Sequence, residues 1–359
     1  MRRKHNTRTG RLLAEILAGS WRTADFPPVS ISEAELDELT PLLCASGGAA
    51  LAWRKISQSE LQNFASAEVL HHAARLQSLQ TAMHEEKVEK TFRLLEEDST
   101  EALLAKGWAA ANLYSDRDLR PSGDIDVMVR PADFRRVREL FSRPEANDCS
   151  VDLHNGFDEF PERTADELFA RAKVRHINDR RIPTLGSEDL LALLCIHFLK
   201  HGAWRPLWLC DVGAAIESLP SSFDWDLCLG RNRTRARWIE CVIPLARHLL
   251  GSEPVRVPFS VEAATLPAWF VENVLQQWAT PFASNQAPMN HPLPMAQLVR
   301  RPSELMKGLG GRWPNAILAT VSVEGNFNEL PRFPYQLANC VTRAGRFVVQ
   351  GIRGSSDDD

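Results

Sequence analysis

The feature that most constrains this chain is a short segment in which acidic and apolar residues alternate, Gly123-Asp124-Ile125-Asp126-Val127-Met128-Val129. Alternation with a period of two predicts a β-strand, in which residues i and i+2 point to the same face. Asp124 and Asp126 are therefore expected to project side by side, while the apolar residues enter a core. Two adjacent carboxylates repel each other unless a cation neutralises them, and hard oxygen ligands suit Mg²⁺. The segment thus predicts a metal site on a strand.

A second acidic strand is predicted at Val151-Asp152-Leu153-His154, where Asp152 lies between apolar residues. A third carboxylate beside the first two would allow two metal ions about 3.5–4 Å apart, the arrangement used for in-line displacement at phosphorus. Asp152 would bind the second metal and accept the proton of an attacking hydroxyl. The predicted catalytic and metal-binding residues are therefore Asp124, Asp126 and Asp152, with Mg²⁺ or Mn²⁺ as the ion.

Basic residues and glycines surround this segment and predict a phosphate-binding loop. Lys106-Gly107 closes an earlier apolar run, and Arg120 lies just upstream of Gly123. Guanidinium groups bind phosphate oxygens bidentately, and Gly107 would let backbone amides approach a triphosphate at the start of a helix. Lys106, Gly107, Arg120 and Gly123 are accordingly the predicted nucleotide-binding residues.

Patterns along the chain predict an α+β fold with a small mixed-sheet core between two helical regions. Residues 101–155 show the order strand, helix, strand, helix, strand. The predicted divisions are an N-terminal helical region (1–98), the α/β core (99–180), a mainly helical C-terminal region (181–345) that includes loops over 281–315, and a disordered tail (346–359). In the long helix predicted over 66–97, apolar residues recur at helical spacing: Val69, Ala73, Leu76, Leu79 and Met83.

Taken together, these motifs resemble the nucleotidyltransferase superfamily of the polymerase β type, and more narrowly a bacterial nucleotidyltransferase-like family that is often left uncharacterised. The resemblance rests on Lys106-Gly107, on Arg120-Pro121-Ser122-Gly123-Asp124-Ile125-Asp126 and on Val151-Asp152-Leu153-His154, and it covers roughly residues 70–250. Downstream it includes His197, His201, Trp204, Trp208, Asp211 and Phe223-Asp224-Trp225. It implies metal-dependent transfer of a nucleotide from a nucleoside triphosphate to an acceptor hydroxyl, with release of pyrophosphate.

Two departures from the superfamily pattern keep other functions open. The usual Gly-Gly or Gly-Ser is Gly107-Trp108 here, and the interval between Asp126 and Asp152 is short. Both features favour a catalytically inactive module that binds a nucleotide or a partner. A phosphoryl-transferring kinase is a further alternative, although the chain lacks HRD, DFG and GxxxxGK[ST] signatures.

Several residues have both a structural and a functional interpretation. His197 and His201 are four apart, so they share a helical face; core packing competes with lining a substrate pocket or binding zinc. By parity His154 shares the face of Asp152, either as a packed residue or near the site. Trp204 and Trp208 would pack helices or stack on a ligand, and Asp211 would cap a helix, form a salt bridge or support the site.

Bulk properties limit the partners and the compartment. The net charge is −4 and the isoelectric point about 6.2, so general nucleic-acid binding is not predicted. The expected acceptor is a small molecule or a peptide or protein, ahead of RNA. Seven scattered cysteines without a CxxC pair indicate reduced thiols. The longest apolar run is about half a membrane span, and Glu15 interrupts the apolar N-terminal stretch. A soluble cytoplasmic protein of unspecified oligomeric state is expected.

Overall fold

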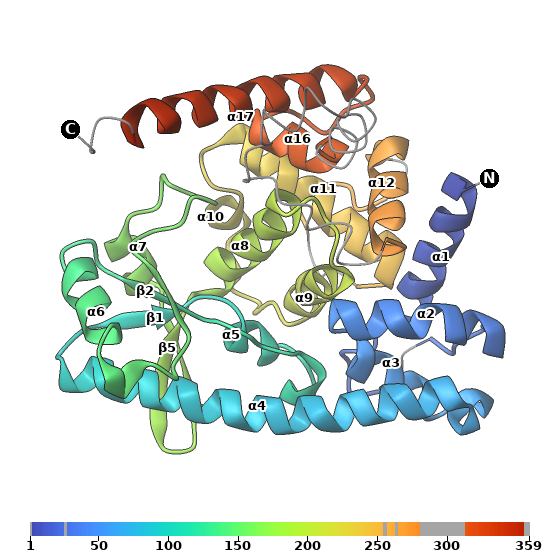
Figure 1. Cartoon of the computed structure of the whole chain (residues 1–359), viewed down its shortest axis with the longest axis horizontal. Coiled ribbons are helices and arrows are strands. Elements are labelled where there is room, and N and C mark those ends of the chain that lie inside the picture. Colours follow the sequence, from blue (N-terminus) through green and yellow to red (C-terminus); the bar gives the residue numbers. More distant parts are fainter. Residues whose placement is uncertain (1, 25–26, 254–256, 263–264, 281–312, 355–359) are drawn as a thin grey trace, which may run out of the picture.

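The computed structural model describes residues 2–24, 27–253, 257–262, 265–280 and 313–354. A sheet lies at one end of the molecule, N-terminal helices lie at the other, and C-terminal helices cover the region between them (Figure 1). The α+β architecture predicted from the sequence is confirmed. The proposed disordered tail begins inside a helix that continues to Gly354, and residues 281–312 and 355–359 lie outside the described chain.

The five strands that the structure describes form one mixed sheet in the order β3-β2-β1-β5-β4. The strands are β1 (Ala102–Leu104), β2 (Ile125–Val129), β3 (Val151–His154), β4 (Lys173–Ile177) and β5 (Arg180–Thr184). β1 is antiparallel to β2 and parallel to β5, whereas β2 and β3 are parallel. The predicted strand–helix–strand–helix–strand order is present in β1 to β3, and the β4–β5 hairpin extends the sheet on its other side.

Short helices connect these strands, and some of them begin at a start signal in the sequence. They are α5 (Trp108–Ala111), α6 (Phe134–Phe141), α7 (Ala165–Ala170) and the 3₁₀ turns η2 (Arg117–Leu119) and η3 (Pro144–Ala146). Thr164 starts α7 with a capping box, in which its side chain and Glu167 satisfy each other's backbone amides. A Pro at the first position of η3 has no amide hydrogen to leave unpaired.

The N-terminal helical region consists of α1 (Arg2–Leu17), α2 (Glu33–Ser46), α3 (Ala49–Ile56), η1 (Glu60–Asn63) and α4 (Ala65–Glu97). Ser32 and Glu35 form the capping box that starts α2, and Gly47 ends that helix in the left-handed conformation. α4 is long enough to pack against α2 and α3 at one end and against the sheet at the other. In Figure 1 it runs along one whole edge of the molecule.

The two faces of the sheet belong to different cores. Alternate residues of β2, including Ile125 and Val127, pack with Val88 and Phe92 of α4. Met128 of β2 and Leu103 of β1 face the opposite way and join a larger core. Asp126 shares the face of Met128 by strand parity, so it points away from α4.

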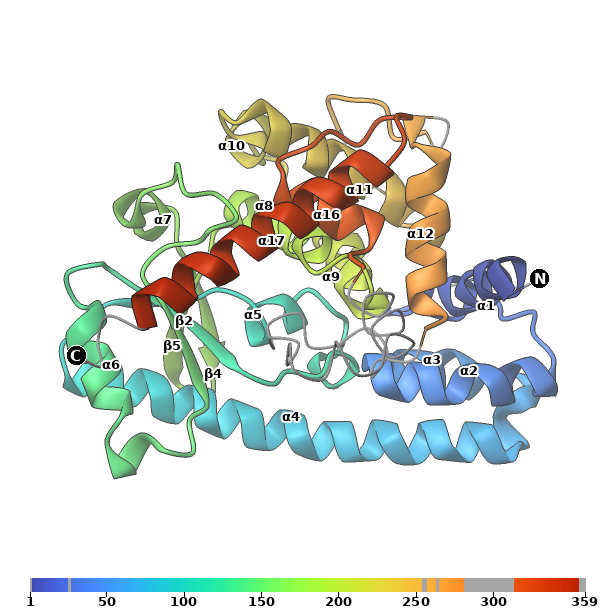
Figure 2. The same cartoon turned by 45° about the horizontal axis from the view of Figure 1, so that its top comes forward.

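The larger core is formed mostly by C-terminal helices. These are α8 (Ser187–Lys200), α9 (Pro206–Glu217), α10 (Trp225–Leu229), α11 (Arg233–Leu250), α12 (Ala268–Trp278), α16 (Ala316–Ser322) and α17 (Phe333–Gly354). α8 is buried on nearly all sides, as its continuous apolar sequence predicts. α17 packs on α16 and extends beyond it as the outermost helix of this region (Figure 2). Within the described chain, no helix combines the length and apolar character that a membrane span requires.

Candidate functional site

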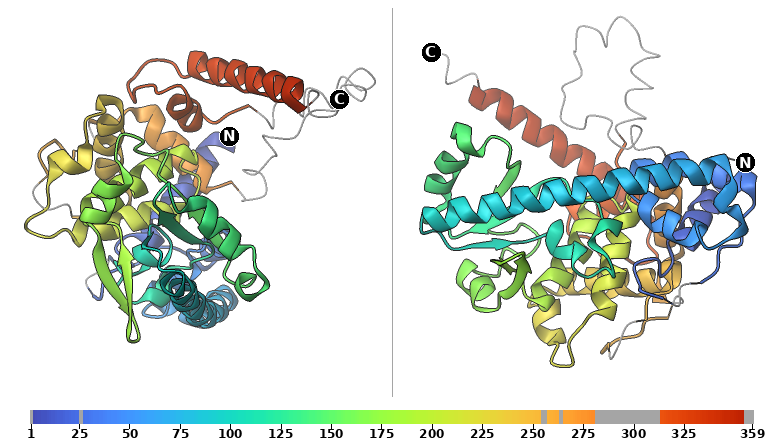
Figure 3. Two further views of the ribbon diagram at one scale, coloured as in Figure 1. Left: turned by 90° about the vertical axis from the view of Figure 1, so that its left-hand side faces the viewer. Right: turned by 90° about the horizontal axis from the view of Figure 1, so that it is seen from below.

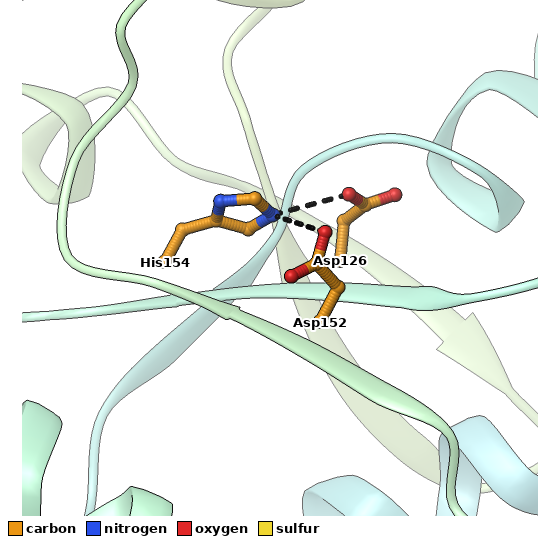
Figure 4. A group of neighbouring side chains, drawn as sticks. All are labelled: Asp126, Asp152 and His154. Atoms are coloured by element: carbon orange, nitrogen blue, oxygen red, sulfur yellow. Dashed lines mark hydrogen bonds and ion pairs between the residues drawn. The ribbon is translucent and has the colours of Figure 1, made fainter. Parts of the chain in front are cut away.

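Two of the three predicted carboxylates lie directly beside each other on neighbouring strands. The parallel pairing of β2 with β3 places Asp126 opposite Asp152, and His154 follows two residues later on the same face. His154 Nε2 lies 3.2 Å from Asp126 Oδ1 and 3.3 Å from Asp152 Oδ2 (Figure 4). One possible ligand atom from each of these three residues lies within 4.8 Å of the others. We call Asp126, Asp152 and His154 the carboxylate cluster.

The donor set of this cluster fits a divalent cation. Carboxylate oxygens are the preferred ligands of Mg²⁺, and an imidazole nitrogen beside them is also acceptable to a transition metal such as Mn²⁺. The Asp152 side chain is 58% exposed, whereas that of Asp126 is 13% exposed. The cluster therefore has one open side, from which a ligand can approach, and one sheltered side.

Lys106 joins the cluster from the end of β1. The amide of Ala105 donates to the carbonyl of Asp126 at 2.9 Å, which extends the β1–β2 pairing and brings the next residue to the same edge. Lys106 Nζ then lies 2.9 Å from Asp126 Oδ1. Burial opposes ionisation of Asp126, but the hydrogen bond from His154 and the charge of Lys106 outweigh it and lower the pKa of this carboxyl group. Asp126 is thus held in its charged form.

Asp124 does not join this cluster. β2 begins at Ile125, so Asp124 lies in the preceding loop, exposed to solvent. Within the described part of the chain its carboxylate forms no hydrogen bond or ion pair. The pairing of β2 with β3 begins at Ile125 and Val151. Asp124 therefore lies one residue before the strand on which it was expected, and its role as a metal ligand stays a prediction.

Gly107 brings the turn after β1 close to the loop that carries Asp124. Its φ of +57° lies in the left-handed region, which residues other than glycine rarely adopt. A Cβ at this position would lie 3.4 Å from the carbonyl oxygen of Asp124. Gly123 has open space where a Cβ would lie. The two predicted glycines therefore differ, because the backbone conformation requires glycine only at Gly107.

The unusual Trp108 after Gly107 does not fill this turn. Its indole is buried in the core between α4 and the sheet, and Nε1 donates to Glu85 Oε1 at 2.8 Å. Glu85 also pairs with Arg117, whose Nε lies 2.6 Å away. Trp108 thus anchors the turn to α4, so the departure from the usual Gly-Gly or Gly-Ser does not obstruct the space beside Lys106.

Arg120, predicted to bind phosphate, forms a buried ion pair with the protein. Its Nη2 and Nε donate to the two carboxylate oxygens of Asp211 at 2.9 and 3.1 Å. Tyr114 donates to Asp211 Oδ1 at 2.7 Å. Burial lowers the pKa of Arg120 and the charge of Asp211 raises it, with a net rise, so the guanidinium stays charged. These contacts hold the loop before β2 against α9. Of the alternatives predicted for Asp211, the structure shows the salt bridge.

Two histidines and two tryptophans from the start and end of the α8–α9 turn form an aromatic group near Lys106. The ring centroids of His197 and His201 are 4.3 Å apart, and those of Trp204 and Trp208 are 5.3 Å apart. Trp208 also contacts both imidazoles. Burial lowers the pKa of His197 well below its usual value, and the electrostatic effects of His201 and Lys106 lower it further. The group is therefore a neutral packed cluster, and no third metal ligand joins the two histidines among the described residues.

A groove of about 710 Å³ opens beside the carboxylate cluster. Lys106 and His154 lie at its edge, the segment after β3 forms one wall, and α8, α11 and α16 contribute the other. Its lining combines apolar and charged side chains: Phe134, Leu153, Phe157, Trp238, Leu318, Val321, Asp158, Glu159, Lys200, His201, Arg235 and Glu324. The ion pairs Lys200–Glu159 and Arg235–Glu324, each 3.6 Å, cross this surface. A larger cavity of about 860 Å³ lies away from the cluster, between α4 and the β4–β5 hairpin.

Comparison with known proteins identifies one family. The sequence model of a family described as uncharacterised nucleotidyltransferase matches residues 32–251, which is more than half of the chain. The matched range includes α4, the whole sheet, the carboxylate cluster and helices α8 to α11. Searches of curated proteins and of solved structures found no match.

Proposed function

The chain belongs to the uncharacterised nucleotidyltransferase family, and we propose that it transfers a nucleoside monophosphate from a nucleoside triphosphate to an acceptor hydroxyl, releasing pyrophosphate. Family membership supports nucleotidyl transfer in general. The observation that carries the specific proposal is the pairing of Asp126 with Asp152 on adjacent strands, with Lys106 2.9 Å from Asp126. This arrangement provides two acidic ligands and the ammonium group of Lys106, beside an open groove that Lys106 and His154 line.

Asp126 and Asp152 are the residues that would hold Mg²⁺ or Mn²⁺. Such an ion, when bound, neutralises phosphate oxygens and stabilises charge that develops during displacement at phosphorus. Asp124 is retained as a third proposed ligand, because its exposed carboxylate lies at the entrance to β2 without a protein partner among the described residues. His154 orients both cluster carboxylates through its two contacts.

The chain's own residues would perform the remaining steps. Asp152, the more exposed carboxylate, accepts the proton of the attacking hydroxyl. Lys106 neutralises charge on the phosphates, and the turn at Gly107 presents its backbone toward them. Arg120 keeps the intervening loop in place through Asp211 and Tyr114, and it is a nucleotide-binding residue only indirectly.

We propose that the groove beside the cluster binds the acceptor. Its volume of about 710 Å³ falls within the range of roughly 300–1,000 Å³ typical of small-molecule sites. Its mixed charges and apolar patches differ from the continuous basic surface that an RNA acceptor would require. A small molecule is therefore the preferred acceptor, with a peptide or protein hydroxyl second. We also propose a cytoplasmic location, which the seven unpaired thiols support.

The decisive experiment identifies the product of the reaction. Purified protein would be incubated with each nucleoside triphosphate, Mg²⁺ or Mn²⁺ and a cell extract. Asp126→Asn and Asp152→Asn variants would serve as controls. Pyrophosphate release by the native protein, together with a nucleotidylated extract component detected by mass spectrometry, is the expected result. A nucleoside diphosphate as the only product would identify a kinase, and metal-independent nucleotide binding without turnover would identify an inactive module.

A further inference from the structure

Helix α4 carries an apolar face that the fold leaves uncovered. Four large apolar side chains on it are substantially exposed: Val69 (51%), Leu76 (47%), Leu79 (65%) and Met83 (59%). The view from below in Figure 3 shows α4 along the outside of the molecule. The sequence spacing of these residues predicted a helix, and the buried face of that helix is a different one. Ala67 and Leu70 pack on the N-terminal helices and Val88 on the sheet.

The exposed residues have the spacing of a helix–helix seam. Val69, Leu76 and Met83 are seven residues apart, and Leu79 follows Leu76 by three, as at the a and d positions of a heptad. A single large hydrophobic residue on a surface is ordinary, whereas four on one stripe over several turns mark an interaction site. The partner that matches this geometry is another helix.

The polar residues of the same stripe indicate the direction of that partner. The remaining d positions within it are His72 near one end and Glu86 near the other, and both are exposed. In a parallel pair of identical helices each would face its own copy, which sets Glu86 against Glu86. In an antiparallel pair centred between Leu76 and Leu79, His72 faces Met83 of the second helix and Glu86 faces Val69. Each Glu86 then lies about one turn from the other helix's His72.

We propose that α4 pairs antiparallel with α4 of a second copy of this chain, around a two-fold axis between Leu76 and Leu79. A self-complementary patch of this kind closes as a dimer. Each helix contributes four large apolar side chains to the seam, so we expect the dimer to dissociate at micromolar rather than nanomolar concentrations. Asp126 faces away from α4, so both carboxylate clusters stay open in the dimer.

The first test is the mass in solution. Sedimentation equilibrium of the full chain over a micromolar range should show twice the chain mass of 40.3 kDa. The double variant Leu76→Asp/Leu79→Asp should raise the dissociation constant about tenfold or more. The control Leu337→Asp, at an exposed position on α17, should leave the constant unchanged. Unchanged circular dichroism would show that the variants fold. A monomeric native chain, or a double variant that dimerises as the native chain does, would overturn the proposal.

The second test fixes the orientation through disulfide trapping. A mixture of the His72→Cys and Met83→Cys variants should form a cross-linked dimer under mild oxidation. His72→Cys alone should not exceed the background given by the native cysteines, of which Cys44 is exposed. Efficient cross-linking of His72→Cys with itself would overturn the antiparallel arrangement. Neither test depends on turnover, so failure here leaves the proposed transferase activity unaffected.

Discussion

The ion pairs Arg120–Asp211 and Lys106–Asp126 differ in how far they are exposed, and this difference indicates a structural role for the first and a catalytic role for the second. Arg120 and Asp211 are almost fully enclosed, with side chains 8% and 0% exposed, and they meet through two hydrogen bonds plus one from Tyr114. Lys106 and Asp126 make one contact and are 16% and 13% exposed at the edge of a groove. A closed pair has all its donors and acceptors satisfied, so it contributes to the fold. A partly open pair can exchange its partner for a ligand.

Breaking the closed pair should have the largest effect. Asp211→Ala leaves a buried guanidinium without its counter-charge, so the free energy of unfolding should fall by about 3–5 kcal/mol. Urea denaturation monitored by circular dichroism measures this change. In the double variant Arg120→Met/Asp211→Leu, which removes both charges, the loss should be clearly smaller than the sum of the single changes. A loss below about 1 kcal/mol for Asp211→Ala would show that the pair does not anchor the loop.

Breaking the open pair should affect activity rather than stability. Asp126→Asn keeps the shape of the side chain but removes one metal ligand charge, so pyrophosphate release should fall by at least about a hundredfold. Its thermal midpoint should stay within a few degrees of the native value, because the side chain keeps its size and its remaining oxygen can still accept from Lys106 and His154. An unfolded Asp126→Asn variant would place this pair in the same class as Arg120–Asp211.

His84 of α4 is buried near the enclosed pair Arg120–Asp211, and it gives a pH-dependent test of how that region contributes to stability. Burial, and after it the charge of Arg120, lowers the pKa of His84 to about 4, and its Nε2 has no hydrogen-bond partner among the described residues. The unfolded chain binds this proton near pH 6.5, so the stability is fully present above that pH and declines as pH falls toward the folded value. When the pH falls from 7 to 5, the free energy of unfolding should decrease by about 1–2 kcal/mol less in the His84→Leu variant than in the native chain. Parallel urea-denaturation curves at the two pH values measure this, and identical losses would contradict it.

The smallest effect is expected for the exposed carboxylate outside the cluster. Asp124→Asn should reduce pyrophosphate release by about tenfold, less than Asp126→Asn, because Asp124 lies outside the group of ligand atoms and its role depends on recruitment by substrate. The same assay, run at several metal concentrations, compares the two variants. Equal losses would show that Asp124 is a full member of the working site.

Local sequence patterns predicted much of the core but could not predict long-range pairs. The alternation in residues 125–129 and 151–154 was sufficient to place β2 and β3, and the family resemblance and α+β architecture are confirmed. His154 could have been ranked higher, since parity alone puts it beside Asp152. The β4–β5 hairpin was missed, although Asn178-Asp179 is a turn signal between alternating residues.

Other features depend on partners distant in the sequence. Arg120 and Asp211 are 91 residues apart, and no local spacing indicates that they meet. The pairing of β2 with β3 begins at Ile125 and Val151, which leaves Asp124 one residue before the strand, and its role as a metal ligand stays a prediction. In α4 the apolar spacing correctly indicated a helix. The spacing could not show which of two apolar faces the rest of the chain would cover.

The length of α4 has a mechanical consequence for the groove. At 33 residues the helix is about 50 Å long, and it is packed on the N-terminal helices at one end and on the sheet at the other. A continuous helix packed at both ends keeps the N-terminal helices and the sheet at a fixed separation. A change in groove width on substrate binding would then involve the two walls of the groove, the segment after β3 and the helices α8, α11 and α16, rather than a shift of the N-terminal helices relative to the sheet.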